Sequence, residues 1–215
     1  TRTVADPDYG LRLTGRQGRH TYGVFAAQDS VTQILIPGVL GSHFAFLDQE
    51  ALAAAGRYRY DFDGQASVGA IATLRDGDGY SNSVIGIDGR WQRDEHTLSG
   101  QYLTRTTDNP HSMGMPDHQG GDALAARYQF SNREWGYYGN YVRFDEGFRA
   151  DLGFISQVGY DKAEIGASHN WYGEEGKAIN QMRLNANWDI THAEDGRLLE
   201  RELEAYFGVN GPMQS

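Results

Sequence analysis

The segment from Gln181 to Ile190 alternates polar and apolar residues without a break. Successive side chains of a β-strand point to opposite faces, so this pattern predicts a strand with one polar and one apolar face. The same alternation recurs along most of the chain, in segments long enough to cross a bilayer as tilted strands. The sequence therefore predicts an all-β protein, and specifically an antiparallel transmembrane β-barrel of the bacterial outer membrane.

Composition narrows the alternatives. The chain has 215 residues and no apolar run of the roughly 20 residues that a membrane-spanning helix needs. A net charge of −10 argues against sequence-independent nucleic-acid binding, which depends on basic groups. The absence of cysteine excludes thiolate metal sites, disulfides and cysteine nucleophiles. We expect one barrel domain over residues 1–215, or a fragment of a larger barrel, with a processed or truncated N-terminus.

We predict about twelve strands from this pattern. Only Gln49–Ala55, with its Ala-Leu-Ala-Ala-Ala core, has a helical character, and it lies inside a connection. The predicted strands are Leu11–Thr14, His20–Gln28, Arg57–Phe62, Ala66–Leu74, Ser81–Gln92, His96–Thr106, Asp122–Phe130, Trp135–Phe144, Leu152–Asp161, Ala163–Tyr172, Lys177–Ile190 and Arg197–Val209.

Short and long connections alternate between these strands. Outer-membrane barrels have short turns on the periplasmic side and long loops outside, so the alternation favours a barrel over a soluble sandwich. The short connections are Gly15–Arg19, Asp63–Gln65, Arg93–Glu95, Ser131–Glu134 and Thr191–Gly196. The long ones include Asp29–Gly56, Thr107–Gly121 and Asp145–Asp151.

The polar faces of these strands carry charges of both signs. A basic residue at the bilayer midplane costs about 2–4 kcal/mol, so these side chains must face water or one another. They would line a channel in a wide barrel, or form a salt-bridge network that plugs a narrow one. The residues assigned to this lumen face are Asp88, Arg90, Arg105, Arg127, Glu164, Gln181, Arg183, Asn185, Asn187, Asp189, Glu202 and Glu204.

Aromatic residues give a second membrane signal. Trp91, Trp135, Trp171 and Trp188 fall near predicted strand ends, where the aromatic girdles of membrane barrels lie. The segment Trp135–Phe144 does not separate into two faces, because tyrosines occupy both sets of alternate positions.

Three segments carry Gly, Thr and aromatic motifs in a fixed order: Leu13–Phe25, then Ser67–Asp76 followed by Gly86–Asp88, and then Phe148–Ile155. In this order they resemble the barrel region of uncharacterised bacterial outer-membrane proteins that carry a family 9 carbohydrate-binding-like domain ahead of the barrel. The resemblance covers roughly Leu11–Lys162. It implies a membrane barrel with no established reaction. No carbohydrate-binding-like domain precedes Leu11, so its glycan role is not carried over.

Other chemistry is weakly indicated. The acidic segment Asp76–Gly79 departs from the calcium-hand pattern, and an Asp-Gly hairpin turn is the better reading. The segment Thr107–Asp122 holds histidines and aspartates that could ligate a metal, but their spacing matches no known pattern. His169 follows Ser168, yet the two point to opposite faces, which disfavours a serine hydrolase. We therefore predict no catalytic residue, cofactor site or metal site.

The favoured hypothesis is a non-enzymatic outer-membrane barrel that acts as a passive, porin-like conduit or as a membrane scaffold for a partner. The expected partners are outer-membrane lipid, other envelope proteins or further copies of the chain, and not nucleic acid. An alternative is a surface glycan-binding all-β module without a transmembrane role, whose aromatic residues would cluster on one face or loop. An outer-membrane enzyme is a third hypothesis.

Overall fold

A computed structural model describes residues 7–30, 32–47, 49–111, 114–174 and 179–211. Across these residues the chain is an antiparallel all-β protein, which confirms the predicted class, and no helix among them is long and apolar enough to cross a membrane. The strands are β1 (Pro7–Gln17), β2 (His20–Asp29), β3 (Thr32–Gly38), β4 (Gly41–Leu47), β5 (Ala51–Phe62), β6 (Ala66–Gly77), β7 (Tyr80–Arg93), β8 (His96–Asp108), β9 (His118–Ser131), β10 (Trp135–Phe144), β11 (Tyr160–Tyr172), β12 (Gln181–Ala193) and β13 (Leu198–Asn210).

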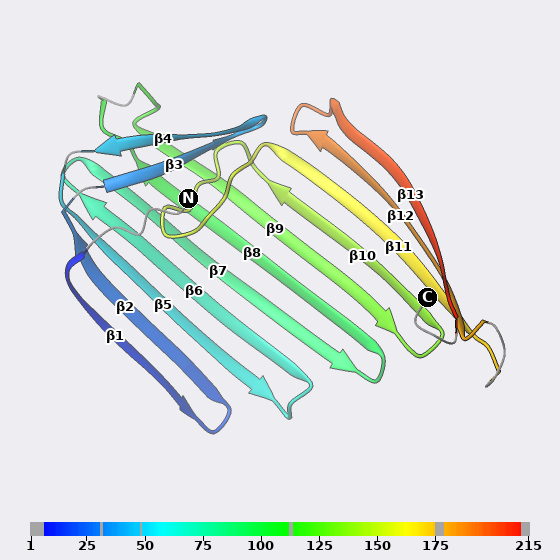
Figure 1. Cartoon of the computed structure of the whole chain (residues 1–215). Coiled ribbons are helices and arrows are strands. Elements are labelled where there is room, and N and C mark those ends of the chain that lie inside the picture. The colour runs from blue at the N-terminus through cyan, green and yellow to red at the C-terminus, as the bar shows by residue number, and fades with distance from the viewer. Residues whose placement is uncertain (1–6, 31, 48, 112–113, 175–178, 212–215) are drawn as a thin grey trace.

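Eleven of these strands form one continuous sheet in the order β1-β2-β5-β6-β7-β8-β9-β10-β11-β12-β13. Every neighbouring pair in this sheet is antiparallel. The sheet curves but does not close, since β1 and β13 are its edges and do not pair with each other (Figure 1). Strands β3 and β4 form a separate hairpin that lies across one end of the sheet (Figure 1).

The connections lie at two opposite rims of the sheet. The short-turn rim holds the turns at residues 18–19, 63–65, 94–95 and 132–134, together with the connection from β11 to β12. The loop rim holds the connection with the β3–β4 hairpin and those at 78–79, 109–117, 145–159 and 194–197. Asp63–Gln65, Arg93–Glu95 and Ser131–Glu134 thus lie opposite the two longest predicted connections. The turn at 78–79 is the two-residue Asp-Gly hairpin that the sequence indicates, with Gly79 at a φ of 65°.

The helix predicted at Gln49–Ala55 is wrong, because β5 begins at Ala51 and pairs with both β2 and β6. The burial pattern explains why this alanine-rich segment is a strand. Ala51 and Ala53 are almost fully buried on one face, whereas Leu52 is exposed on the other. Small side chains leave room for the segment that covers this part of the sheet, and ladder pairing on both sides outweighs the helical propensity of alanine.

The strand predicted at Leu152–Asp161 is also wrong. These residues belong to a connection between β10 and β11, and regular pairing begins only at Tyr160. Because this predicted strand is absent, the chain crosses the sheet one time fewer before Thr191–Gly196. That connection therefore lies at the loop rim and not at the rim of the other short turns. The connection between Asp29 and Gly56 contains the β3–β4 hairpin, which the sequence pattern missed. Residues 177–178, at the start of the predicted strand Lys177–Ile190, lie outside the described residues.

The connection at residues 145–159, here called the inner loop, folds back over one face of the sheet near the loop rim (Figure 1). Phe148 and Val158 are fully buried and pack with Val84 and Ala123 in the small apolar core. Since these two loop residues are covered completely, the inner loop is a packed part of the fold rather than a free surface loop.

Packing on the polar face explains why the sequence of β10 does not separate into a polar and an apolar face. Phe144 packs against the apolar core beneath it, and Tyr138 donates a hydrogen bond to Glu164 Oε1 at 2.6 Å on the same face. Tyr137 and Tyr141 occupy the other face, as the register with β9 and β11 requires. Covered or hydrogen-bonded aromatic side chains therefore sit on the otherwise polar face, which hides the alternation in the sequence.

The inner loop can approach the sheet closely because β9 offers glycine. A Cβ on Gly121 would lie 2.6 Å from the Phe148 amide nitrogen, whereas a Cβ on Gly120 would meet nothing nearer than the Arg105 carbonyl oxygen at 3.7 Å. We expect Gly121→Ala to lower the free energy of unfolding by about 1–3 kcal/mol through overpacking. Gly120→Ala should change it by less than about 1 kcal/mol. Hydrogen exchange at the Phe148 amide, measured with unfolding in urea, checks both; equal effects of the two variants would contradict the close approach.

Candidate functional site

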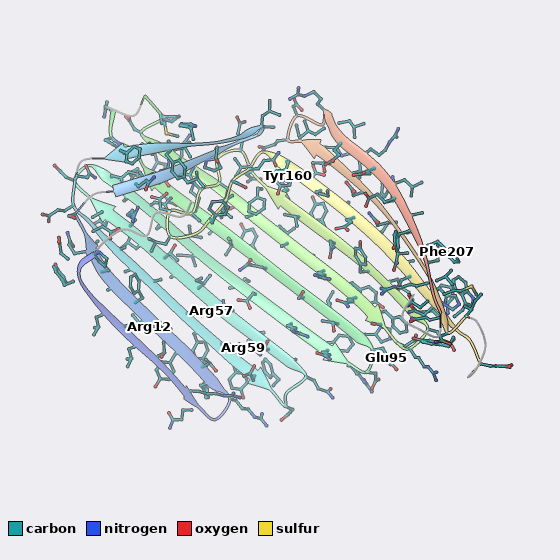
Figure 2. The ribbon with its side chains drawn as sticks, viewed as in Figure 1. Arg12, Arg57, Arg59, Glu95, Tyr160 and Phe207 are labelled. Carbon is teal, nitrogen blue, oxygen red and sulfur yellow. The ribbon has the colours of Figure 1, made fainter. Side chains whose placement is uncertain are left out.

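The sheet has one apolar and one polar face. On the apolar face, large side chains stay exposed along its whole width, including Leu11 (74%), Ile87 (62%) and Leu203 (75%). The polar face carries most of the charged and amide side chains, although Arg143, Asp161 and Arg201 lie on the apolar face towards the loop rim. The polar face is also the face that the inner loop covers. Figure 2 shows Arg57 and Arg59 on this face. The polar face is the candidate functional surface because the chain's polar chemistry gathers there.

All twelve predicted lumen residues lie on this polar face, as the strand register shows. Many of them share one row across the sheet, in which each residue is paired with the next by the ladder. This row reads Arg90, Ser99, Arg127, Asn140, Glu164, Asp189 and Glu202 from β7 to β13. Cross-strand neighbours in such a row have Cβ atoms about 4.5–5.5 Å apart, so the row forms a continuous polar stripe.

Most of these side chains have a local partner. Asp88 is paired with Arg57, and Asp189 Oδ2 lies 3.1 Å from Lys162 Nζ. Glu164 accepts hydrogen bonds from Tyr138 and from Asn140, the latter at 3.0 Å. Other contacts of this kind join Gln181 to Asn170 (3.2 Å), Arg183 to Asn185 (2.9 Å) and Asn187 to Glu204 (3.3 Å).

Charge is distributed unevenly along the polar face. Arginines dominate on β5 to β9, and carboxylates dominate on β11 to β13. The basic part contains Arg57, Arg59, Arg75, Arg90, Arg105 and Arg127 with Asp61 and Asp88, whereas the acidic part contains Glu164, Asp189, Glu200, Glu202 and Glu204 with Lys162 and Arg183. The two parts together give the face a lateral gradient of charge.

A buried polar network fixes the inner loop to the sheet. Arg149 Nε lies 3.1 Å from Asp151 Oδ1, and both side chains are almost completely covered. Arg149 also donates to the Tyr80 hydroxyl and to Asn109 Oδ1, each at 3.1 Å, while Tyr80 donates to Asp151. Buried charges are costly unless paired, so this network commits the loop to one position.

Two further contacts complete the attachment of the inner loop. Asn82 Nδ2 donates to the Arg149 carbonyl oxygen at 3.2 Å, and its Oδ1 accepts the Asp151 amide at 3.2 Å. Arg105, a predicted lumen residue, donates to the carbonyl oxygens of Gly147 and of Gln119, the latter at 2.9 Å. The side chain of Arg105 thus holds the loop instead of facing open solvent.

The β3–β4 hairpin is anchored on the same face. Arg75 Nη2 lies 2.6 Å from Asp29 Oδ2 in a buried ion pair, and Arg75 Nη1 donates to the Gln33 carbonyl oxygen at 3.1 Å. At the tip of the hairpin, the Val39 carbonyl accepts a hydrogen bond from Gln157 at 2.7 Å. Hairpin and inner loop therefore brace each other over the loop-rim half of the polar face.

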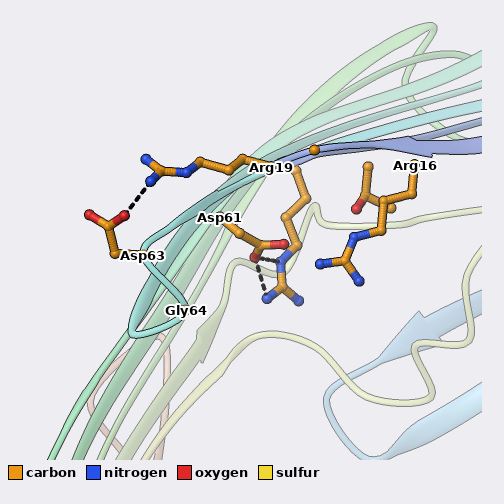
Figure 3. Close-up of a pocket in the computed structure, with 8 residues that line it drawn as sticks. Arg16, Arg19, Asp61, Asp63 and Gly64 are labelled. Atoms are coloured by element: carbon orange, nitrogen blue, oxygen red, sulfur yellow. Dashed lines mark hydrogen bonds and ion pairs between the residues drawn. The ribbon is translucent and has the colours of Figure 1, made fainter.

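The short-turn rim is open by comparison. A cavity of about 440 Å³ near the first turn is lined by Arg16, Arg59 and Asp61 among others, and Arg59 Nη2 lies 2.6 Å from Asp61 Oδ1 (Figure 3). At the turn itself, a hydrogen bond with Tyr60 and the charge of Asp63 raise the pKa of Arg19. These charges are exposed to solvent and contribute to the polar surface more than to stability.

The other candidate groups do not assemble into a reactive site. His118 is 2.7 Å from Asp108 and His111 is 3.4 Å from Asp117, as separate pairs, and the described residues contain no group of three or more metal-ligating side chains. His169 stacks on Trp135 with ring centroids 4.0 Å apart on the apolar face. Residues 112–113 of the segment Thr107–Asp122 lie outside the described part of the chain.

Sequence reasoning missed the buried network. Arg149 and Asp151 precede the segment interpreted as a strand, and no periodic pattern marks a loop that folds back. The one available signal was the pair of adjacent glycines, Gly120 and Gly121, in an otherwise regular strand, which indicates close approach of another backbone.

Comparison of the chain with protein-family models, with curated proteins and with solved structures gives no match. The resemblance to the outer-membrane proteins with a family 9 carbohydrate-binding-like domain therefore stays a prediction.

The buried ion pair predicts a large local effect of one substitution. Asp151→Asn leaves Arg149 without its carboxylate, and we expect the attachment of the inner loop to weaken by about 3–5 kcal/mol. Asp195→Asn, which alters an exposed pair with Arg197 at 3.9 Å, is the matched control and should change stability by less than about 1 kcal/mol. Hydrogen exchange of the Phe148 and Gly153 amides reports the attachment. Unchanged protection in Asp151→Asn would show that the network does not hold the loop.

Proposed function

We propose that this chain forms the wall of a bacterial outer-membrane β-barrel, without enzymatic activity, whose polar face lines a passive conduit for solutes. The observation that carries the proposal is the exposed apolar face that runs across all eleven strands of the sheet. Contiguous exposed apolar surface of more than a few hundred Å² marks a membrane or interaction surface. If lipid contacts that face and water contacts the other, the apolar and the polar side chains of every strand are each in a favourable environment.

The dimensions of the apolar face fit a bilayer. On β11, Asp161 lies near the loop rim and Trp171 near the short-turn rim, both on the apolar face. The ten-residue separation corresponds to about 33 Å of strand at ~3.3 Å per residue. At a tilt of about 45° this gives a height of ~23 Å. The outward apolar band of known barrels is about 25 Å tall.

The aromatic side chains also support a membrane boundary. Trp91, Trp135 and Trp171 lie near the short-turn rim, as predicted. Trp188 lies in the middle of β12, paired with Ile165 and Leu203, and not at a strand end. In the glycan-binding alternative, open ring faces would stack on sugars. Near the short-turn rim, rings of β9, β10 and β11 cover one another, since Phe130 stacks on Tyr137 at 4.4 Å and Trp135 on His169 at 4.0 Å. This mutual packing favours a girdle over a sugar platform.

The strand directions set a condition for closure. Counted across the sheet, β1 and β13 are the first and the eleventh strands of an all-antiparallel array, so they run in the same direction. Pairing them directly would create a parallel contact. Bacterial barrels have an even number of antiparallel strands, so the proposed barrel includes an odd number of strands besides these eleven.

A charge on the apolar face distinguishes lipid from water. Ile87 lies mid-strand and is 62% exposed, so Ile87→Arg should have little effect on a sheet that is in water. If the face contacts lipid, the same change should destabilise the chain in vesicles, lowering its free energy of unfolding there by about 2–4 kcal/mol. Gln101→Arg, next to the register partner of Ile87 but on the polar face, is the matched control.

Both variants are compared with the original chain by urea titration in lipid vesicles, with heat-modifiable gel mobility as the measure of folding. A loss for Ile87→Arg but not for Gln101→Arg supports the membrane wall. Equal stability of the two variants, or folding that does not depend on lipid, would contradict it.

The rims give a prediction about orientation. Asp117→Cys lies at the loop rim and Glu95→Cys at the short-turn rim, and both positions are exposed. Because short turns face the periplasm in such barrels, a membrane-impermeant maleimide should label Asp117→Cys on intact cells and should label Glu95→Cys only after lysis. Labelling of both on intact cells, or the reverse pattern, would show that the orientation is wrong.

A further inference from the structure

Two arginine–glutamine pairs face each other across β8 on the polar face. Arg90 Nη2 donates to Gln92 Oε1 at 2.9 Å on β7, and Arg127 Nη2 donates to Gln129 Oε1 at 3.4 Å on β9. The register places Ser99 between the arginines and Thr97 between the glutamines. The six side chains therefore form a symmetrical patch two rows deep.

These two arginines differ from the others on β5 to β9. Arg57, Arg59 and Arg75 each pair with an aspartate, and Arg105 donates to main-chain carbonyls. Among the ion pairs of the described residues, none involves Arg90 or Arg127. Their glutamine partners orient the guanidinium groups but do not neutralise them. Among the described residues, these two fixed positive charges thus have no ion-pair partner.

The patch supplies hydrogen-bond donors to its centre. Each glutamine uses its carbonyl oxygen on the arginine, which leaves its NH₂ group as a donor, and Ser99 and Thr97 add hydroxyl groups. Arginines two strands apart have Cα atoms about 10 Å apart, so both side chains can reach one small group between them. Guanidinium groups bind phosphate-like and carboxylate oxygens in a bidentate manner.

A cavity of about 530 Å³ lies over these residues. It is also bordered by two carboxylates at the turn, where Asp94 Oδ2 lies 3.9 Å from Arg93 Nε and Glu95 is exposed at the rim (Figure 2). Asp94 lies in the turn just after the end of β7, four residues from Arg90 and so at most about 13 Å from it along the chain. The carboxylates are therefore at the entrance, and the arginines are at the base.

We propose that Arg90 and Arg127 form a binding site for a small divalent oxyanion of the phosphate or sulfate type, bound between the two guanidinium groups over Ser99. The site rests on the geometry of the polar face and not on the membrane assignment. In the proposed conduit it lies on the half of the wall that the inner loop leaves open, so it selects anionic solutes there.

The test is calorimetric titration of the folded full chain with inorganic phosphate, with sulfate and with acetate, at low ionic strength because salt screens exposed charges. Phosphate and sulfate should bind at one site, and acetate at least about tenfold more weakly. Arg90→Gln and Arg127→Gln should each weaken binding of the divalent anions by about tenfold or more, the loss expected for one charge-assisted hydrogen bond.

Arg183→Gln is the matched control. Arg183 lies on the same face and contacts Asn185 in a similar way, but its ladder neighbours are Asn170 and Gly208, so no second arginine faces it. This variant should bind within about twofold of the original chain. The β-sheet signal in far-ultraviolet circular dichroism verifies that every variant is folded.

Three results would overturn the proposal: no saturable binding of phosphate or sulfate, an equal loss in Arg183→Gln, or binding of a neutral disaccharide that survives the double Arg90→Gln/Arg127→Gln change. The last would indicate a glycan surface. Since these titrations involve no passage through a membrane, they are independent of the Ile87→Arg experiment, and either idea can fail alone.

Discussion

The antiparallel ladder is the constraint on which the rest of this structure depends. Eleven strands of 10 to 14 residues pair in one sheet. Alternate residues of each strand therefore point to opposite faces, and the register decides which residues share a face. A shift of one residue in any strand would exchange the faces of that strand and place charge among Ile85, Ile87 and Leu203. The separation of the two faces therefore maintains the register, and the register maintains the polar row from Arg90 to Glu202.

A single curved sheet cannot build a core of its own, and the structure compensates on one half of the polar face only. The inner loop and the β3–β4 hairpin cover the loop-rim half, where Phe148, Val158 and Ile34 are fully buried. The same loop also brings in Arg149 and Asp151, whose burial depends on Tyr80 and Asn82. Apolar packing and a network of buried ion pairs and hydrogen bonds act together there to hold the inner loop.

Much of the sheet could be predicted from sequence, because period-two alternation acts residue by residue. The faces of β7, β9 and β12 follow directly from it, and the ends of β10 are those expected. The errors fall where tertiary contacts override local pattern. Leu152–Asp161 alternates like a strand, but its residues follow an anchored turn at Arg149 and meet no ladder partner before Tyr160. Gln49–Ala55 is alanine-rich because a covered strand needs small side chains, a reason that no local propensity contains.

The arginines of the polar face also fall into two groups, those under the inner loop and hairpin and those on the open half of the sheet. Among the described residues of β5 to β9, the arginines at the covered end, Arg75 and Arg105, serve as anchors and donate to Asp29 or to main-chain carbonyls. Towards the short-turn rim the polar face is open, and Arg90 and Arg127 have only amide partners. An arginine side chain that holds a loop in place cannot also bind a solute, because its hydrogen-bond donors are already occupied by the loop. Binding of solutes to this face is therefore expected at Arg90 and Arg127, which have no ion-pair partner among the described residues. The acidic strands β11 to β13 form the other lateral half of the polar face.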